Sequence, residues 1–343
     1  MKKKLLSVIL VVSLIFSCSI LSFAQEGTLK SNDKINTKFD YSFAKQDSWK
    51  DKPRNEKLES CQIPKDTAEK MTTEALLDSI LENPFTVDMF AYDSYEEGYQ
   101  KVKDEIFVFQ NLLDRSDLGS ILVKKHSICS EGSSDKDLMN SMYLSVMIAQ
   151  PEIEKKISDV DIISFKNSLK VKDNHIYKNS KEDHKIQIDS TISLLSGYTT
   201  VYTPKGSHIQ VYESTDPDYT VAQQQAMHST FASTYNYSSY VSPASNRYNC
   251  HSYAWYSQST SNPYWMNTPY CDAYINDGSY YQVPTAAAND RIHWHEGDHT
   301  GIIVGVGPQA GNMTVISKYG FYGVYRAFIG DMPYSGNYYY YRR

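Results

Sequence analysis

Apolar residues recur at helical spacing through the first half of the chain. Leu76 and Ile80 fall on one face of a helix expected over 71–81, and either Thr72 or Thr73 is placed to cap it. Further stretches carry the same apolar stripe, and Asn-Pro and Glu-Gly-Ser-Ser turn signals separate them. We therefore predict an all-helical domain over residues 58–150, with none of its residues placed for chemistry. Its other helices are expected over 95–113, 117–125 and 135–149.

The period of the apolar pattern changes to two beyond Tyr198, which is typical of half-buried strands. Helical and strand-like stretches together predict an α+β domain over residues 196–343, in which one cysteine-bearing helix packs on an antiparallel sheet. The expected elements are strands over 199–202, 207–212, 299–306, 313–317 and 323–328, helices over 221–233 and from Cys250 to Tyr256, and a turn over 276–279.

The N-terminus has the pattern of a secretory signal peptide over residues 1–24. Three lysines precede an apolar run, and Ser22-Phe23-Ala24 offers small residues where signal peptidase reads, so we predict cleavage before Gln25. Lipidation of Cys18 is disfavoured, because a bulky phenylalanine stands two residues before it. No other stretch is long and apolar enough to span a bilayer. We expect a secreted protein without stable membrane insertion after cleavage.

Two polar segments flank the helical domain. Residues 25–57 are charged and poor in apolar residues, which predicts an exposed linker. Residues 151–195 alternate lysine with acidic and amide residues, which predicts a charged helix followed by a linker. The net charge of −6 gives no reason to expect nucleic acid as a partner. Most of the 29 tyrosines lie from Tyr198 onward. They indicate either a surface that contacts polymers or half-buried strands.

Four cysteines remain after the predicted cleavage, and an exported chain permits disulfides. If Cys250 acts as a nucleophile, Cys61 and Cys129 could pair with each other and Cys271 would be left over. A bridge between Cys250 and Cys271 is the alternative, and sequence spacing does not decide between the two.

Cys250 stands where the start of a helix would activate it. Asn249 is a good N-cap, and the helix macrodipole is expected to lower the pKa of the thiol and favour the thiolate. His299 opens an apolar strand downstream, and a helical cysteine followed by a histidine on a later strand is the papain-like arrangement. The alternative is a metal site, since His293 and His295 would share one face of a strand and His299 could complete the ligand set.

The segment from about Thr203 to the end of the chain resembles a family of secreted Firmicutes proteins with papain-like domains, related to NlpC-type cell-wall peptidases and CHAP amidases. The helical stretch from Cys61 to Lys125 resembles a domain that recurs at the N-terminus of such proteins. Two features depart from the family: His251 directly follows the cysteine, and no obvious polar third member stands on the strand after His299. The matching motifs are Tyr248-Asn249-Cys250-His251-Ser252-Tyr253-Ala254-Trp255, Asp277-Gly278-Ser279-Tyr280, His299-Thr300-Gly301-Ile302-Ile303-Val304 and Ile316-Ser317-Lys318-Tyr319-Gly320.

The resemblance implies Cys250 as nucleophile and His299 as general base. Ser317 is the first candidate for the group that orients the imidazole and Asn312 the second. The backbone N–H of Cys250 is an expected oxyanion donor. His251 has either a functional role or a place on the solvent side of the helix.

Three function classes follow from these residues. The first is a secreted cysteine hydrolase that cleaves amide bonds, with peptidoglycan of a Gram-positive wall or another extracellular peptide as substrate and with no cofactor or metal. The second is a non-catalytic wall-binding or adhesion protein that keeps the papain-like fold. The third is a metal-dependent hydrolase built on His293, His295 and His299.

Overall fold

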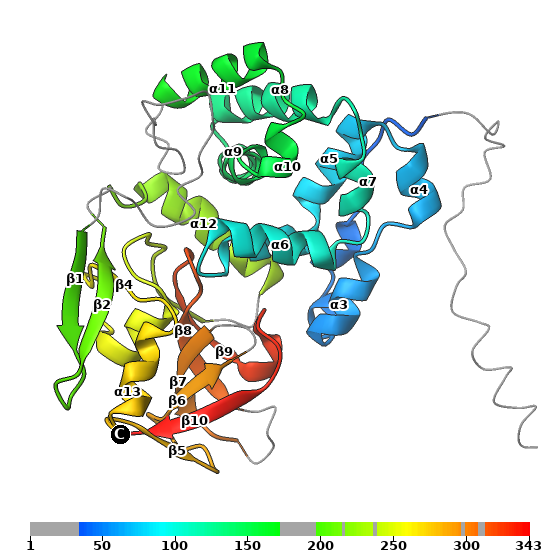
Figure 1. Cartoon of the computed structure of the whole chain (residues 1–343). Helices are drawn as coiled ribbons and strands as arrows, with labels where there is room; N and C mark the ends of the chain where they lie inside the picture. Colours follow the sequence, from blue (N-terminus) through cyan, green and yellow to red (C-terminus); the bar gives the residue numbers. More distant parts are fainter. Residues whose placement is uncertain (1–33, 172–196, 215–216, 236–238, 296–298, 308–312) are drawn as a thin grey trace, which may run out of the picture. The chain divides into compact units, whose positions relative to one another are not determined.

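Helices make up the first half of the described chain, and strands with a few helices make up the second half, as the two apolar patterns predict (Figure 1). The computed structural model describes residues 34–171, 197–214, 217–235, 239–295, 299–307 and 313–343. Its helices and antiparallel strands confirm the predicted α+β class. The predicted signal peptide and Cys18, together with most of the linker expected before residue 195, lie outside the described residues.

Helices dominate the described chain up to Val171, and they stand at each of the four expected positions. The Ala75 N–H donates to Thr72 Oγ1 over 3.3 Å, so Thr72 rather than Thr73 caps its helix. Within the described residues, no helix combines the length and the apolarity that a membrane span requires. The elements are η1 (Ser42–Lys45), α2 (Asp47–Lys50), α3 (Arg54–Ser60), α4 (Lys65–Lys70), α5 (Thr73–Glu82), η2 (Pro84–Phe90), α6 (Tyr95–Glu105), α7 (Phe109–Leu113), α8 (Leu118–Glu131), α9 (Asp135–Ile148), α10 (Pro151–Glu154) and α11 (Asp159–Val171).

The segment before α4 differs from the polar linker expected over 25–57. Its described residues form η1, α2 and the start of α3, and they bury Tyr41 and Trp49. Trp49 Nε1 donates to Ser60 Oγ over 2.9 Å, and the Tyr41 hydroxyl accepts from Asn83 Nδ2 over 3.2 Å. Two aromatic side chains thus supply the buried area that the sparse apolar pattern did not indicate.

The helix expected over 95–113 is broken into α6 and α7. Residues 106–108 leave the helix, and Gln62 bonds the backbone groups that the break releases. Its Nε2 donates to the Glu105 carbonyl over 2.9 Å, and its Oε1 accepts from the Phe107 N–H over 3.1 Å. Because Gln62 is 43 residues away from Glu105, the local apolar pattern cannot reveal the break.

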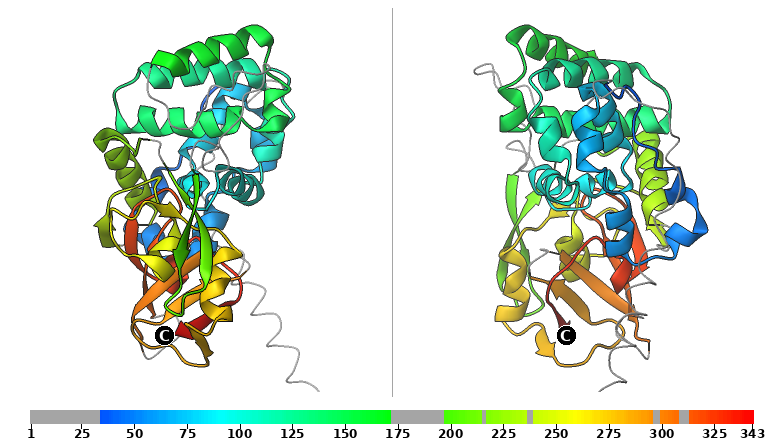
Figure 2. Two further views of the ribbon diagram at one scale, coloured as in Figure 1. Left: turned by 60° about the vertical axis from the view of Figure 1, so that its left-hand side comes forward. Right: turned by 90° about the vertical axis from the view of Figure 1, so that its right-hand side faces the viewer.

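Two antiparallel sheets hold the strands, and Figure 2 shows the strands of the larger one side by side. The smaller sheet has the order β1-β2-β4, and the seven-stranded sheet has the order β3-β9-β8-β7-β6-β10-β5. The expected hairpin, the helix over 221–233 and the three later strands are all present, whereas β3, β4, β5, β6 and β10 are additional. The elements are β1 (Gly197–Tyr202), β2 (His208–Glu213), α12 (Val221–Thr234), β3 (Ser239–Ser242), η3 (Ser252–Tyr256), β4 (Tyr264–Trp265), η4 (Tyr270–Asp272), α13 (Ala273–Asn276), β5 (Tyr281–Val283), β6 (Arg291–Trp294), β7 (His299–Gly305), β8 (Thr314–Lys318), β9 (Val324–Phe328), η6 (Ile329–Asp331) and β10 (Tyr338–Arg342).

Strand register places the start of β7 against β6 on one side and β8 on the other. His299 pairs with Trp294 of β6, and Ile302 pairs with Ile316 of β8. Because neighbouring strands run antiparallel, Ser317 lies one position further toward the start of β7. The register therefore brings Ser317 within reach of the first residue of β7.

The helices and the larger sheet share one hydrophobic core, and residues 35–343 form one compact unit. Their backbones meet at Gly320, where an added Cβ would lie 2.3 Å from the Tyr92 carbonyl oxygen. Gly320 has a φ of +48°, which favours glycine. The next residue, Phe321, donates its N–H to the Phe90 carbonyl over 2.9 Å. Separate folding of the segments 58–150 and 196–343 stays a prediction.

Candidate active site

Cys250 opens a short helical turn that ends at Tyr256. Its first residues are α-helical, and the rest, η3, is π-helical. Asn249 caps the turn as predicted, because its Oδ1 accepts from the Ser252 N–H over 3.1 Å. A turn this short adds few aligned peptide dipoles, so it offers the thiol little of the activation that the sequence led us to expect.

The Cys250 thiol is fully buried beside a carboxylate. Its Sγ lies 3.6 Å from Asp93 Oδ1 and 3.8 Å from Asp93 Oδ2. Burial and the charge of Asp93 raise the pKa of Cys250 to about 12, although His251 and the backbone of Thr300 oppose the shift by hydrogen bonding. The protonated thiol is therefore the resting form. The expectation that the helix start favours the thiolate is wrong, since desolvation outweighs it.

Asp93 reaches the thiol from the helical part of the chain, between η2 and α6. Asn249 Nδ2 donates to Asp93 Oδ2 over 2.8 Å and fixes the carboxylate. No residue of the helical domain was expected beside Cys250. The position of Asp93 shows that this expectation is wrong. The one local signal, an aspartate just before the Ser94 cap of α6, is common in loops and marks no site by itself.

His251 completes what we call the thiol cluster, which consists of Asp93, Cys250 and His251. Its Nε2 lies 3.4 Å from Asp93 Oδ2, and its Nδ1 lies 2.8 Å from Thr300 Oγ1. The side chain is fully buried, so the alternative of a solvent-facing His251 is wrong. A hydroxyl can donate or accept, and Thr300 therefore holds the ring in place while permitting either neutral tautomer.

His299 forms a second pair on the neighbouring strands. Its Nε2 lies 2.8 Å from Ser317 Oγ, the residue that the sequence ranked first for this contact. The Tyr334 ring stacks on the imidazole with the ring centroids 3.4 Å apart, and Ser317 Oγ also donates to the Thr300 carbonyl over 2.8 Å. These contacts fix the plane and the Nε2 edge of the His299 ring. The second-ranked residue, Asn312, lies outside the described residues.

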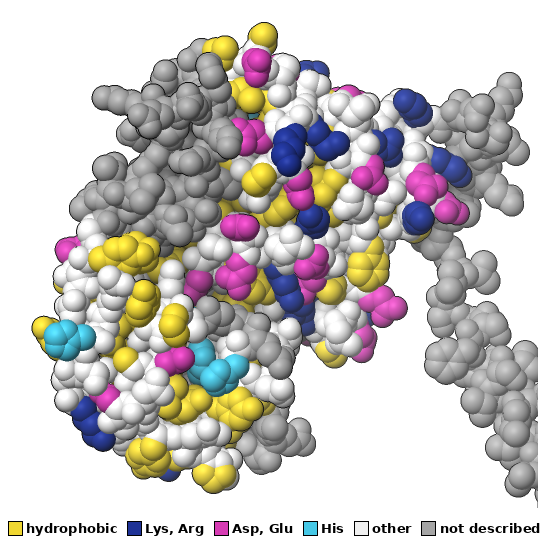
Figure 3. Space-filling view, in the orientation of Figure 1, with side chains coloured by type: hydrophobic (Ala, Val, Ile, Leu, Met, Phe, Trp, Pro, Cys, Tyr) yellow, Lys and Arg dark blue, Asp and Glu magenta, His cyan; other side chains and the backbone are white. Residues whose placement is uncertain are grey.

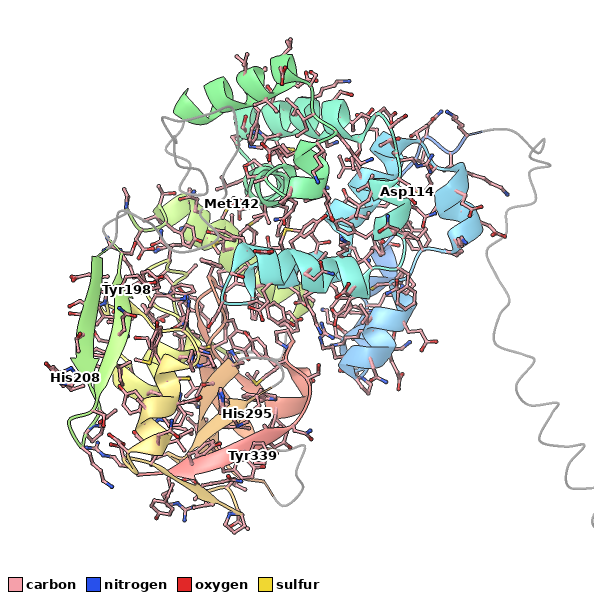
Figure 4. All side chains as sticks on the ribbon, viewed as in Figure 1. Asp114, Met142, Tyr198, His208, His295 and Tyr339 are labelled. Atoms are coloured by element: carbon pink, nitrogen blue, oxygen red, sulfur yellow. The ribbon has the colours of Figure 1, made fainter. Side chains whose placement is uncertain are left out.

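The other two histidines of the expected metal alternative point to different partners. His293 is buried, and its Nδ1 lies 3.1 Å from the His299 carbonyl oxygen. His295 is exposed beside the Tyr339 ring (Figure 4), and its Nε2 lies 3.2 Å from the Tyr341 hydroxyl. The His295 ring packs edge-on against the His293 ring, with the centroids 4.5 Å apart, but it lies at the surface. Within the described residues the group of side chains spaced for a metal ion is the thiol cluster.

Lys318 is a fully buried amine that the sequence analysis did not single out. Its Nζ donates to the Ser245 carbonyl over 2.9 Å and lies 5.2 Å from the centroid of the Tyr248 ring. Burial lowers the pKa of Lys318 to about 7, although negative charges, Asp93 among them, oppose the shift. Lys318 therefore changes its charge near neutral pH, next to Ser317 in the chain.

A cleft of about 460 Å³ opens beside Asp93. Tyr92 and Ser94, the sequence neighbours of Asp93, line it, and so does Ser335. The Asp93 side chain is 10% exposed whereas that of His251 is fully buried, so Asp93 is the member of the pair nearest to solvent. Figure 3 shows acidic side chains over α6, which forms a wall of the cleft. The other lining residues are Glu96, Glu97, Gln100, Lys101 and Asp104.

Four cysteines, Cys61, Cys129, Cys250 and Cys271, carry free thiols in the described chain, and all are buried. Neither the conditional pairing of Cys61 with Cys129 nor the alternative bridge from Cys250 to Cys271 is formed. Cys271 Sγ lies 3.7 Å from the Thr268 hydroxyl and 3.8 Å from Asp272 Oδ1, so both thiols have a carboxylate within reach. Cys250 is distinguished by the buried imidazole of His251 in the same cluster.

No protein-family model, curated protein or solved structure matches the chain. A buried thiol, a carboxylate and an imidazole meet at the start of β7, where the His299–Ser317 pair also lies. These groups can move a proton between sulfur, nitrogen and oxygen, which acyl transfer at an amide bond requires.

Proposed function

We propose that the chain is a secreted papain-like cysteine hydrolase that cleaves amide bonds in cell-wall peptidoglycan. Cys250 is the nucleophile, His299 the general base and Ser317 the group that orients the base. The observation that carries the proposal is the 2.8 Å contact between His299 Nε2 and Ser317 Oγ, at the strand start whose Thr300 backbone hydrogen-bonds Cys250. A cysteine on a helical turn, a histidine at a strand start and a polar partner of that histidine correspond to the papain-like nucleophile, base and orienting group.

In the proposed reaction, the Cys250 sulfur bonds to the carbonyl carbon of the amide, and the carbonyl electrons move to oxygen. His299 takes the thiol proton and returns it to the leaving amine as the C–N bond breaks. Water then hydrolyses the thioester with the same histidine as base. The backbone N–H of Cys250 is proposed to stabilise the oxyanion.

The raised pKa of Cys250 bears on how the base works. At neutral pH the thiol is protonated, so the proton must leave as the sulfur attacks rather than beforehand. A base that is held in one orientation is what such a concerted step needs. Ser317 and the stacked Tyr334 ring supply that restraint on His299.

The test is digestion of purified cell wall, with Cys271→Ala as the matched control. Wild type and Cys271→Ala should release peptide fragments with new amino termini, and Cys250→Ala should release none above background. Cys271 is also buried and free, so its variant controls for the loss of a buried thiol. Equal release by Cys250→Ala and wild type, or no release by either, would end the proposal.

A non-catalytic wall-binding protein is the second candidate, and the complete burial of Cys250 favours it. Exposed tyrosines would then form the working surface, as on the β1–β2 hairpin, which carries Tyr198 (Figure 4). The Tyr198 and Tyr202 side chains are each more than half exposed. Their rings can pack on a polymer while the hydroxyls stay hydrated. This candidate predicts sedimentation with cell wall that Cys250→Ala keeps and a Tyr198→Ser/Tyr202→Ser variant loses, without release of fragments.

A further inference from the structure

We propose that the thiol cluster is a binding site for one zinc-type divalent ion, held by Cys250 Sγ, His251 Nε2 and an Asp93 carboxylate oxygen. The three donor atoms lie within 4.8 Å of one another in the buried site. Thiolate, imidazole and carboxylate form a ligand set that suits Zn²⁺ and its softer neighbours rather than Mg²⁺ or Ca²⁺. Three protein ligands leave a fourth tetrahedral position open.

The thiol donates directly to Asp93 when no ion is bound, and the spacing of the donor atoms also matches the edges of a coordination tetrahedron. With Zn²⁺ bonds of about 2.3 Å to sulfur and about 2.0–2.2 Å to nitrogen and oxygen, a tetrahedron has edges of about 3.6 Å from S to O and about 3.4 Å from N to O. The corresponding distances to Asp93 Oδ2 are 3.8 Å from Cys250 Sγ and 3.4 Å from His251 Nε2. A direct charge-assisted N–H···O bond is shorter, at about 2.7–2.9 Å.

Groups behind the donors hold each ligand in place. Thr300 Oγ1 lies 2.8 Å from His251 Nδ1, so the hydroxyl can accept from Nδ1–H while Nε2 presents its lone pair to the ion. Asn249 Nδ2 donates to Asp93 Oδ2 over 2.8 Å and orients the carboxylate. Loss of a partner of this kind typically lowers metal affinity by about 10- to 100-fold.

The charge of the ligands and the exposure of Asp93 also fit a bound divalent ion. One thiolate and one carboxylate carry two negative charges, which a divalent cation neutralises inside a buried site, and the thiol proton is released to solvent on binding. The Asp93 side chain is 10% exposed, and its neighbours Tyr92 and Ser94 line the cleft of about 460 Å³. The partly exposed Asp93 carboxylate is therefore the ligand at which an ion would enter the site.

Ion binding does not depend on the proposed function, but its consequence for activity does. Coordination draws electron density from the Cys250 sulfur and holds the atom in place, so a metal-bound Cys250 would be a weaker nucleophile toward the amide. If the hydrolase proposal holds, the ion keeps the enzyme inactive until a chelator removes it.

The test titrates metal-free full-length protein with Co²⁺ and with Zn²⁺. Wild type and the control Cys271→Ser should bind one equivalent, with a thiolate-to-cobalt charge-transfer absorption. Cys250→Ser should lose that absorption, and Cys250→Ser, His251→Ala and Asp93→Ala should each bind Zn²⁺ at least tenfold more weakly. Thermal melts without metal check that each variant is folded.

Three outcomes would overturn the site: no saturable binding by wild type, wild-type affinity in folded Cys250→Ser, or loss of the charge-transfer absorption in Cys271→Ser. Cys250→Ser replaces only the sulfur by oxygen, so this variant still tests the metal site if His251→Ala fails to fold. Digestion of cell wall by the metal-free protein is measured separately. A protein that binds the ion but digests nothing disproves the hydrolase alone, and the reverse result disproves the ion site alone.

Discussion

Two buried polar clusters in this molecule are built on opposite principles. In the arginine cluster, made of Arg54, Asp88, Glu105 and Tyr235, the Arg54 guanidinium lies 2.6 Å from Asp88 and 2.8 Å from Glu105. In the thiol cluster, a carboxylate faces a thiol and an imidazole, none of which is a permanent cation. The first cluster sets a permanent cation against its carboxylates, and Lys101 adds a second cation 3.1 Å from Glu105. The second can offset the charge of its carboxylate only by keeping or exchanging a proton or an ion.

The two clusters also differ in the volume of the space beside them. The cavity beside Arg54 and Tyr235 has a volume of about 10 Å³, room for about one water molecule. The cleft beside Asp93 has about 460 Å³. A closed, compensated network stabilises a fold, and an uncompensated group beside open space is the arrangement that chemistry needs. Burial of polar groups alone therefore does not mark a functional site.

The largest expected effect lies beside the thiol cluster. His299→Ala should lower the rate of cell-wall digestion by about a hundred- to ten-thousand-fold, because a positioned base contributes that much to proton transfer. His295→Ala is the control, since that ring is exposed at the sheet surface. Initial rates of amino-terminus release measure both. A greater loss in His251→Ala than in His299→Ala would reassign the base to His251.

The next effect concerns Lys318, which lies behind Ser317. Burial lowers its folded pKa from the ordinary 10.5 to about 7, so the unfolded chain binds more protons between these values. Through this group the free energy of unfolding should rise with pH, by about 5 kcal/mol at most from pH 7 to 10.5. Urea unfolding at several pH values should show that Lys318→Met loses this rise. The exposed Lys65→Met should keep the wild-type slope, and the same slope in Lys318→Met would contradict the assignment.

In the arginine cluster, removing the cation should cost stability rather than chemistry. Arg54→Met leaves Asp88 fully buried without its ion-pair partner, which should lower the free energy of unfolding by about 3–5 kcal/mol. Denaturant melts measure the loss, and Lys50→Met, which breaks an exposed pair with Asp47, should cost less than about 1 kcal/mol. An Arg54→Met/Asp88→Leu double variant should recover part of the loss. Cell-wall digestion by folded Arg54→Met should match wild type, and its specific loss would mean that the arginine cluster takes part in chemistry.

The smallest effect tests the carboxylate beside the thiol. Asp93→Asn removes a negative charge that helps to raise the pKa of Cys250. In metal-free protein near pH 8, iodoacetamide should label Cys250 about tenfold faster for each unit by which the pKa falls. Mass spectrometry follows the labelling, with Cys271 in the same sample as the internal control. An unchanged Cys250 rate would show that desolvation alone sets the pKa.

Local patterns explain how far the sequence predicts this molecule. Strands β7 and β8 carry isoleucine and valine, and β9 carries valine and two aromatic residues, so their sequences indicate strands. Strand β10 is almost entirely tyrosine, which suits either face of a sheet and leaves no alternation to detect. The Ser317 contact was predictable because strand order limits which residues can meet His299. Asp93 was not, because it meets Cys250 across 157 residues of chain.

The contact at Gly320 has a consequence for the order in which the molecule becomes complete. The segment that carries Asp93 docks on residues near the end of the chain, through Gly320, Phe321 and the Tyr334 hydroxyl, which donates to the Ala91 carbonyl over 2.6 Å. A growing chain therefore contains Cys250 well before the residues that seat Asp93 against it. The surroundings of Cys250 therefore depend on segments from both sides of it in the sequence, and they are complete only once these distant segments have met.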